Sequence, residues 1–220
     1  MKKFVFLASL LVLLSAGIAR AEEVRPIQLS LFNPVQVVPE NESIAGVRLG
    51  LLYTVNKDVN GFSFTFGVNR ATGNVQGVEW ALGNWVEGDF HGWQGGLANY
   101  TGRRFVGLQN GWVNVTKGDL TGLQWGIINY TEGFVHGMQG GWVNISKGEF
   151  IGFAAGLVNI NDGGCKGFQL GGVNYADKMK GFQLGFINWT NSLDGLQIGL
   201  GNYNGNKKPF VFLPFVNWSF

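Results

Sequence analysis

The chain has 220 residues, of which 45% are apolar and only 14% are charged, and its formal net charge is +2. Soluble domains average about 25% charged residues, so a composition this poor in charge favours strands with apolar side chains facing outward, toward lipid. A near-neutral chain has no electrostatic reason to bind nucleic acid, and we exclude that partner. Cys165 is the single cysteine, so no intramolecular disulfide can form, and we expect a small packed residue there.

The N-terminal segment 1–21 is typical of an export signal. Lys2 and Lys3 precede an apolar run over residues 4–19, and Ala19-Arg20-Ala21 fits a small-x-small cleavage site, so we expect cleavage after Ala21. A retained membrane anchor is the alternative. Cleavage would remove three basic residues and no acid, which leaves 13 basic and 14 acidic residues and a net charge of −1. No later segment approaches the 18 or so apolar residues that a membrane helix needs.

Residues 22–44 precede the repeats and are expected to form an N-terminal arm or a short strand. Within them, Ile27 to Leu31 alternates apolar and polar residues, which predicts a further strand, a plug or a periplasmic arm. Residues 45–220 are then expected to form one repeat-built β domain that ends in an aromatic strand.

A Gly-Leu-Gln-x-Gly-x-x-Asn motif recurs along this domain at a nearly constant spacing. The first glycine of each copy is Gly77, Gly92, Gly107, Gly122, Gly137, Gly152, Gly167, Gly181 or Gly195. Seven positions later comes an asparagine in every copy, from Asn84 to Asn202. This period of roughly 15 residues is too short for a helical hairpin, so each unit is either one strand with its turn or one coil of a β-solenoid.

Short turn signals between the copies favour the first of these alternatives. Lys117-Gly118 and Glu132-Gly133 resemble two-residue hairpin turns, which would make residues 119–131 one strand of 13 residues. Antiparallel neighbours would then pair Leu123 with Trp142 and Ile127 with Met138. That pairing keeps the large apolar residues on one face and the glycines and glutamines on the other.

The sequence therefore predicts an antiparallel up-and-down transmembrane β-barrel of about 12 strands, with a β-solenoid of 15-residue coils as the alternative. A 13-residue strand tilted in the usual way would rise roughly 33 Å, enough to cross an outer membrane. The expected strands are 45–54, 60–69, 75–85, 90–101, 105–116, 119–131, 134–146, 149–161, 165–175, 179–189, 193–204 and 208–220.

The C-terminus carries a possible assembly signal. Val216, Trp218 and Phe220 alternate up to the last residue, and they resemble the C-terminal strand by which the barrel-assembly machinery recognises outer-membrane barrels. Pro209 and Pro214 depart from that pattern, because proline cannot donate to a strand ladder. The alternative is an aromatic cap that closes the open end of a solenoid.

The repeated Gly-[Leu/Phe]-Gln-x-Gly-x-[Val/Ile]-Asn unit, between an Ile27-Gln28-Leu29 opening and an aromatic C-terminus, resembles a family of bacterial "surface repeat" proteins. The resemblance covers almost the whole mature chain. It implies an outer-membrane or cell-surface location, and it implies no enzyme activity, cofactor or ligand residue. The Gln-x-Gly-x-x-Asn core is also similar to curli-type amyloid repeats, in which glutamines and asparagines stack as ladders.

The third position of the repeat supplies the candidate site. In a barrel these residues would point inward and line a passage for small polar solutes, or they would form a hydrogen-bonded network that fills the interior. The candidate lumen-lining residues are Glu79, Gln94, Gln109, Gln124, Gln139, Gln169, Gln183 and Gln197.

No residues with a catalytic or metal-binding arrangement emerge from the sequence. His91 and His136 share one repeat position, three copies apart, with no cysteine or acid cluster beside them, so we expect rim residues and no metal. We also find no nucleophile with an oriented base. The expected function is a non-enzymatic outer-membrane barrel, structural or a small-solute pore, with the outer-membrane bilayer and the barrel-assembly machinery as partners. The alternative is an exported surface solenoid acting as a binding or assembly module; the oligomeric state is not indicated.

Overall fold

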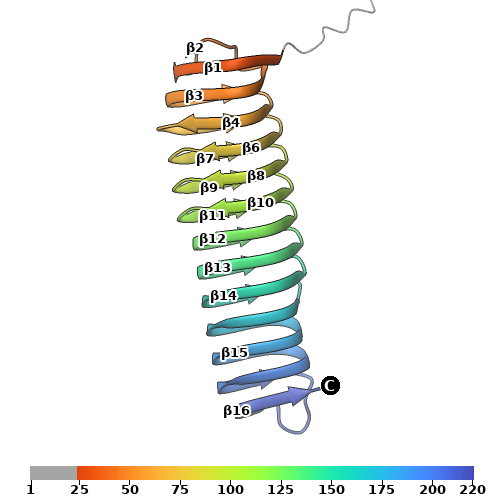
Figure 1. Ribbon diagram of the computed structural model, residues 1–220. Helices are drawn as coiled ribbons and strands as arrows, with labels where there is room; N and C mark the ends of the chain where they lie inside the picture. The colour runs from red at the N-terminus through yellow and green to blue at the C-terminus, as the bar shows by residue number, and fades with distance from the viewer. Residues whose placement is uncertain (1–23) are drawn as a thin grey trace, which may run out of the picture.

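The computed structural model describes residues 24–220, which form a parallel β-solenoid of about ten turns (Figure 1). The predicted antiparallel β-barrel is therefore wrong, and the alternative β-solenoid is the fold. The predicted signal peptide, residues 1–21, lies outside the described residues. The described part of the chain contains no helix that could cross a membrane.

All 16 strands of residues 24–220 belong to one sheet. The first seven are β1 (Val24–Phe32), β2 (Val35–Gln36), β3 (Ser43–Asn56), β4 (Val59–Thr65), β5 (Val68–Ala71), β6 (Val75–Trp80) and β7 (Gly83–Val86). The next four are β8 (Phe90–Gly95), β9 (Ala98–Thr101), β10 (Phe105–Asn110) and β11 (Val113–Thr116). The last five are β12 (Leu120–Thr131), β13 (Val135–Ser146), β14 (Phe150–Asn161), β15 (Cys165–Asn204) and β16 (Phe212–Ser219).

Each coil contributes two strand segments, one to each face of a flattened tube. In β3 the two segments are continuous, and from β4 to β11 they are separate strands, so β6 pairs with β4 and β8 while β7 pairs with β5 and β9, all in parallel. From β12 onward the two segments of a coil are continuous around the bend, and β15 runs through several coils (Figure 1).

Equivalent residues of successive coils stack directly on one another. Between β12 and β13, Gly122 pairs with Gly137, Leu123 with Met138 and Gln124 with Gln139. The predicted pairs Leu123–Trp142 and Ile127–Met138 are therefore wrong. A parallel register offset by one full period places glutamine on glutamine and asparagine on asparagine, whereas the antiparallel register would have placed each against a different residue.

The predicted hairpin turns are wrong as well, because the Lys-Gly segments do not reverse the chain. The backbone N–H of Lys117 donates to Thr101 O at 2.9 Å, and that of Gly118 donates to Arg103 O at 3.2 Å. Both acceptors lie in the preceding coil, so these residues form an arc that continues into the next coil. The first glycine of the repeat makes the close stacking possible: Gly122 has φ +128°, and a Cβ there would lie 2.1 Å from Gly107 O.

Two terminal elements close the ends of the solenoid. β1 pairs in parallel with β3, so the segment predicted as an extra strand, plug or arm belongs to the first coil, and β2 folds back antiparallel on β1. At the other end, β16 reverses direction and pairs antiparallel with the last part of β15, with Leu196 opposite Trp218. The aromatic C-terminal strand is thus a cap.

Candidate functional site

Four residues of each coil point into the solenoid. In the coil of residues 120–131 they are Leu120, Gln124, Asn129 and Thr131, all at most 1% exposed. The first position is apolar in every coil, and Phe90 and Phe105 stack there with ring centroids 5.1 Å apart. The other three positions are mostly polar, so the interior is a narrow apolar column beside a wide hydrogen-bonded one.

The glutamines form a ladder that runs in one direction. Gln124 Nε2 donates to Gln109 Oε1 at 2.7 Å, and Gln139 Nε2 donates to Gln124 Oε1 at 2.7 Å. The amide donors therefore point toward the N-terminus. A glutamine within the stack is both donor and acceptor for its neighbours, so an unbroken stack of identical side chains satisfies itself without water.

The asparagines form a second ladder of opposite direction. Asn114 Nδ2 donates to Asn129 Oδ1 at 2.8 Å, and Asn129 Nδ2 donates to Asn144 Oδ1 at 2.8 Å. The second amide proton of Asn129 bonds Gly140 O of the next coil at 2.8 Å. Side-chain dipoles of the two ladders therefore run antiparallel inside the same tube, and the asparagines also tie the bend of one coil to the next.

The glutamine ladder is interrupted at one coil. Ala154 occupies the glutamine position, and Gln139 Oε1 is the one buried side-chain polar atom of residues 24–220 without a hydrogen-bond partner. In the same coil Asn161 replaces the threonine or serine of the four preceding coils. Its Oδ1 accepts from Gln169 Nε2 at 2.5 Å, and its Nδ2 donates to Ser146 Oγ at 2.5 Å. The larger Asn161 thus fills part of the space that the smaller Ala154 leaves.

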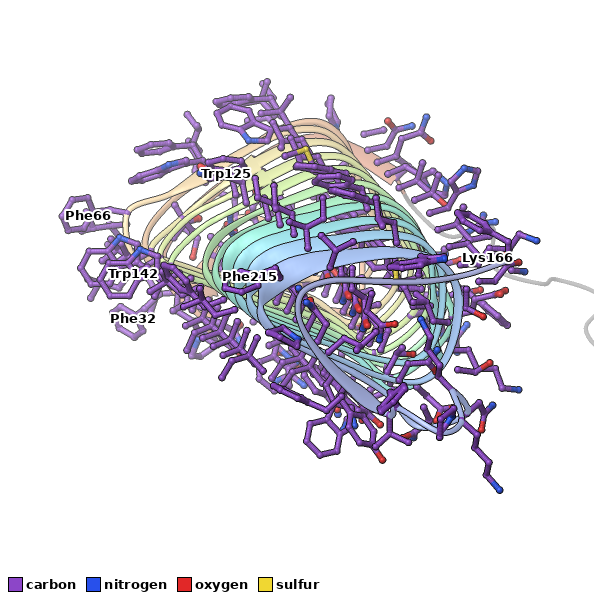
Figure 2. The ribbon with its side chains drawn as sticks, turned by 90° about the horizontal axis from the view of Figure 1, so that it is seen from below. Phe32, Phe66, Trp125, Trp142, Lys166 and Phe215 are labelled. Atoms are coloured by element: carbon purple, nitrogen blue, oxygen red, sulfur yellow. The ribbon has the colours of Figure 1, made fainter. Side chains whose placement is uncertain are left out.

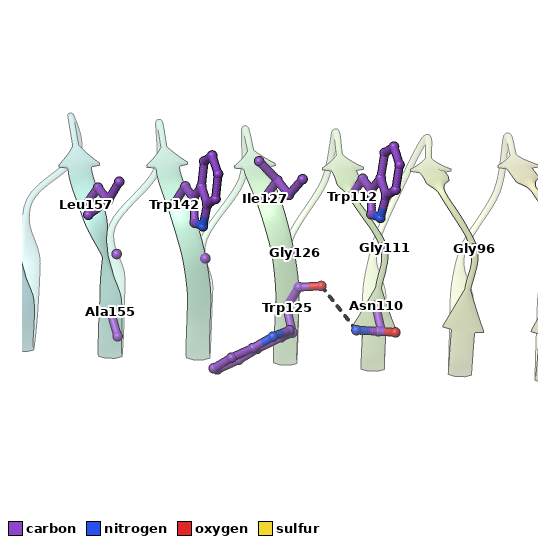
Figure 3. Close-up of a pocket in the computed structure, with 12 residues that line it drawn as sticks. Gly96, Asn110, Gly111, Trp112, Trp125, Gly126, Ile127, Trp142, Ala155 and Leu157 are labelled. Carbon is purple, nitrogen blue, oxygen red and sulfur yellow. Dashed lines mark hydrogen bonds between the residues drawn. The ribbon is translucent and has the colours of Figure 1, made fainter.

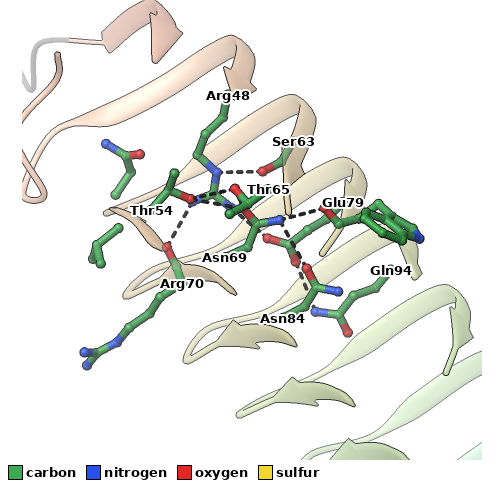
Figure 4. A network of polar contacts seen from close by, with 12 residues as sticks. Arg48, Thr54, Ser63, Thr65, Asn69, Arg70, Glu79, Asn84 and Gln94 are labelled. Atoms are coloured by element: carbon green, nitrogen blue, oxygen red, sulfur yellow. Dashed lines mark hydrogen bonds and ion pairs between the residues drawn. The ribbon is translucent and has the colours of Figure 1, made fainter. Parts of the chain in front are cut away.

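The first coils end the ladder with charge (Figure 4). Glu79 accepts from Gln94 Nε2 at 3.1 Å on one side and from Arg48 Nη2 at 2.7 Å on the other. Both members of this ion pair are fully buried. Burial lowers the pKa of Arg48 and raises that of Glu79, and the attraction between the two opposes both shifts.

The predicted lumen-lining residues lie in the interior of the solenoid. The glutamines and Glu79 do point inward in one column, and every one of them is 0% exposed. Because they stack on one another in the interior, with one interruption at Ala154, they fill the solenoid. The barrel lumen for which they were proposed has no counterpart in this fold.

The remaining predicted residues lie on the outside or at the cap. Val216 and Trp218 belong to β16, and Phe220 is 95% exposed at the chain end. His91 and His136 occupy one outward column, separated by Val106 and Thr121 on the intervening coils. Within the described ranges no group of three or more histidine, cysteine or acidic residues could hold a metal ion.

The outer surface carries the feature that reasoning from the barrel missed. The residue five positions after the first glycine lies at the bend between the two faces, and we call this column the apolar corner. Its members are Leu51, Phe66, Leu82, Leu97, Trp112, Ile127, Trp142, Leu157, Gly172, Phe186 and Leu200. Except for Gly172 they are 36–68% exposed, and they run the length of the solenoid.

A groove follows the middle of the apolar corner (Figure 3). Trp112, Ile127, Trp142 and Leu157 stand along it on successive coils, and Gly111, Gly126, Gly141 and Gly156 form its floor. Its volume is about 880 Å³. Asn110 is its one lining residue with an amide side chain, so the groove offers mainly apolar contact.

Charged residues gather on the opposite side, which we call the charged edge: the arcs that join each asparagine to the next glycine. Lys147 pairs there with Asp162 at 2.5 Å, and Lys166 pairs with Glu149 at 2.6 Å. Viewed along the axis, Phe66 and Trp142 lie on one side of the tube and Lys166 on the other (Figure 2).

Comparison with known proteins adds no assignment: the chain matches no protein-family model, no curated protein and no solved structure.

Proposed function

We propose that this protein is an exported, non-enzymatic β-solenoid that acts as a binding or assembly module of the cell envelope, with the apolar corner as its binding surface. The observation that carries the proposal is the length of that corner: exposed leucine, phenylalanine and tryptophan side chains occupy it on nearly every coil. A monomer exposed only to water would rarely keep a contiguous apolar surface of this extent.

The interior supports a structural role rather than a chemical one. Its polar side chains are buried and, apart from Gln139 Oε1, are hydrogen-bonded within the protein, so they offer little to a substrate. The outward residues provide aromatic and aliphatic contact area, which is what recognition surfaces use. The proposed envelope location rests on the export signal that the sequence predicts over residues 1–21 and on the resemblance to surface repeat proteins. We also propose that this chain belongs to that family.

Envelope association of two variants tests the proposal. The corner variant carries Trp112→Gln, Trp142→Gln and Leu157→Gln. The edge variant carries Lys147→Gln, Glu149→Gln and Asp162→Asn. We expect the wild type and the edge variant to stay with washed envelopes, and the corner variant to be released at least tenfold more. Equal release of all three folded proteins would contradict the proposal.

A further inference from the structure

We infer that the apolar corner and the two faces beside it insert into the acyl layer of one membrane leaflet, with the charged edge held at the water side. This inference rests on the proposed function, since it names the partner of the same surface. The solenoid axis would then lie along the membrane plane.

Charge is confined to one side of the molecule. Between the first glycine and the asparagine of each coil (Thr54 in the coil that starts at Gly46), the only charged residues are Arg48 and Glu79. Both of these are fully buried and paired with each other. The outer surface of the corner and of most of both faces is therefore free of formal charge, and all exposed charge lies at the charged edge or in the terminal segments.

The two faces are apolar on the outside as well as the corner. On one face Phe153, Phe168 and Phe182 stack on successive coils, with centroid separations of 5.3 and 4.9 Å. On the other, Val113, Ile128 and Ile187 are 37–50% exposed. A second copy of the chain could cover one of these sides at a time. A lipid layer covers all three sides together and leaves the charged edge in water, which is why we choose lipid as the occupant.

The dimensions fit one leaflet. A strand segment such as Phe105–Asn110 has six residues and spans roughly 20 Å at about 3.3 Å per residue. The hydrocarbon layer of one leaflet is about 15 Å thick, half of a bilayer core. The corner can therefore lie within the acyl chains while the ion pairs of the charged edge stay among headgroups.

Backbone polar groups beside the corner are satisfied by the neighbouring coil. Hydrocarbon favours N–H and C=O groups that are satisfied within the protein. At the bend, Gly96 N–H donates to Asn110 O and Gly111 N–H donates to Trp125 O, each at 3.0 Å. At the N-terminal end, β2 pairs with β1 and covers part of that outer edge. At the C-terminal end, Pro214 in β16 has no backbone N–H that could be left unpaired.

The groove chemistry favours acyl chains over a sugar or a peptide strand. Polar ligands are oriented by a few well-placed donors and acceptors in a pocket. Here the floor is glycine and the walls are tryptophan, isoleucine and leucine, with Asn110 as the single amide (Figure 3). Moreover, Asn110 Nδ2 contacts Trp125 O at 3.4 Å, so it is partly occupied by the protein itself.

Protein-free phosphatidylcholine vesicles test the inference directly. We expect the wild type and the edge variant to float with the vesicles, and the corner variant to bind at least tenfold less while keeping the same circular dichroism spectrum. Wild type that stays with envelopes but ignores vesicles would overturn the lipid inference and leave the proposed function standing, with a protein partner. Wild type that ignores vesicles and sediments as a dimer would also overturn it, with a second copy as the occupant.

Two spin labels in one coil report the orientation. We would attach nitroxides at Trp142→Cys and, separately, at Lys147→Cys, each in a Cys165→Ala background. With vesicles, the label at 142 should become accessible to oxygen and hidden from a water-soluble nickel chelate, and the label at 147 should show the reverse. Equal access of the chelate to both labels on vesicle-bound protein would overturn the orientation.

Discussion

The first coils and the middle coils fill the same inward column with different chemistry. In the middle, glutamine stacks on glutamine, and each amide serves the next. In the first coils the column holds Arg48, Ser63 and Glu79, joined by hydrogen bonds and an ion pair. Identical amides can be repeated from coil to coil, whereas a charged side chain needs one specific partner. Coils that carry glutamine are therefore interchangeable at this position, and the first coils are not.

The first coils and the middle coils share one backbone conformation at the first glycine of the repeat. Substitutions that disturb this conformation should have the largest effect in both regions. Gly61 and Gly122 have φ of +135° and +128°, and at each a Cβ would lie 2.1 Å from the carbonyl oxygen of the preceding coil. We expect Gly61→Ala and Gly122→Ala each to lower the free energy of unfolding by at least about 3 kcal/mol, measured by urea denaturation.

Gly83 is the matched control for this prediction. A Cβ there would make only an ordinary contact, 3.4 Å from Val68, and its φ is not in the left-handed region. Gly83→Ala should change stability by less than about 1 kcal/mol. Similar losses at Gly83 and Gly122 would show that the glycine column is not the feature that sets the spacing of the coils.

The charged end of the column should be the more fragile side-chain network. Arg48→Met leaves Glu79 buried without its partner, and we expect a loss of about 3–5 kcal/mol. Arg70→Met, at an exposed ion pair with Glu87, should cost less than about 1 kcal/mol. Adding Glu79→Gln to Arg48→Met should recover most of the loss, because the amide can continue the glutamine ladder. No recovery in the double variant would contradict this account.

The interrupted coil allows a smaller and sharper test. Ala154→Gln alone should be destabilising because Asn161 occupies the space, and Asn161→Thr alone should remove one of the two acceptors of Gln169 Nε2 and leave only Tyr175 O. The double variant restores the composition of the other coils and gives Gln139 Oε1 a donor. We expect a favourable coupling energy of about 1–2 kcal/mol from a double-mutant cycle. If the effects of the two single substitutions on stability simply add, then Asn161 does not compensate for Ala154.

Labelling of the Cys165 thiol tests whether the interior stays closed, and this test requires no substitution that could change stability. It lies in the apolar column between Phe150 and Met179, and burial raises the pKa of its thiol to about 12. We expect maleimide labelling near neutral pH to be negligible in the native protein and complete in urea. Rapid labelling without denaturant would mean that the interior opens at this coil.

Much of the interior was predictable from the repeat. The invariant asparagines and the inward glutamines follow from the period and from the alternation of side chains along a strand. The direction of the strands did not follow, because one repeat period accommodates either one long strand with a two-residue turn or two short segments with two bends. The decisive signal was present in the sequence: only a parallel register stacks Gln124 on Gln139 and Asn129 on Asn144.

The apolar corner was harder to find because alternation alone hides it. Ile127 and Ile128 are adjacent and both are exposed, which a straight strand would not allow but a bend does. The absence of exposed charge between each glycine and asparagine was also visible in the sequence. Without the bend, that pattern is equally consistent with the lipid-facing side of a barrel, and the barrel prediction followed from it.

Distances between spin labels test the parallel stack most directly. We would place one nitroxide at Asn60→Cys and a second at Thr121→Cys, His136→Cys, Ile151→Cys or Lys166→Cys, in a Cys165→Ala background. These outward positions lie four, five, six and seven coils below Asn60 in one column. The account predicts distances that rise evenly by about 4.8 Å per coil, from about 19 to about 34 Å. Distances that alternate, or that fail to increase from one position to the next, would contradict the solenoid.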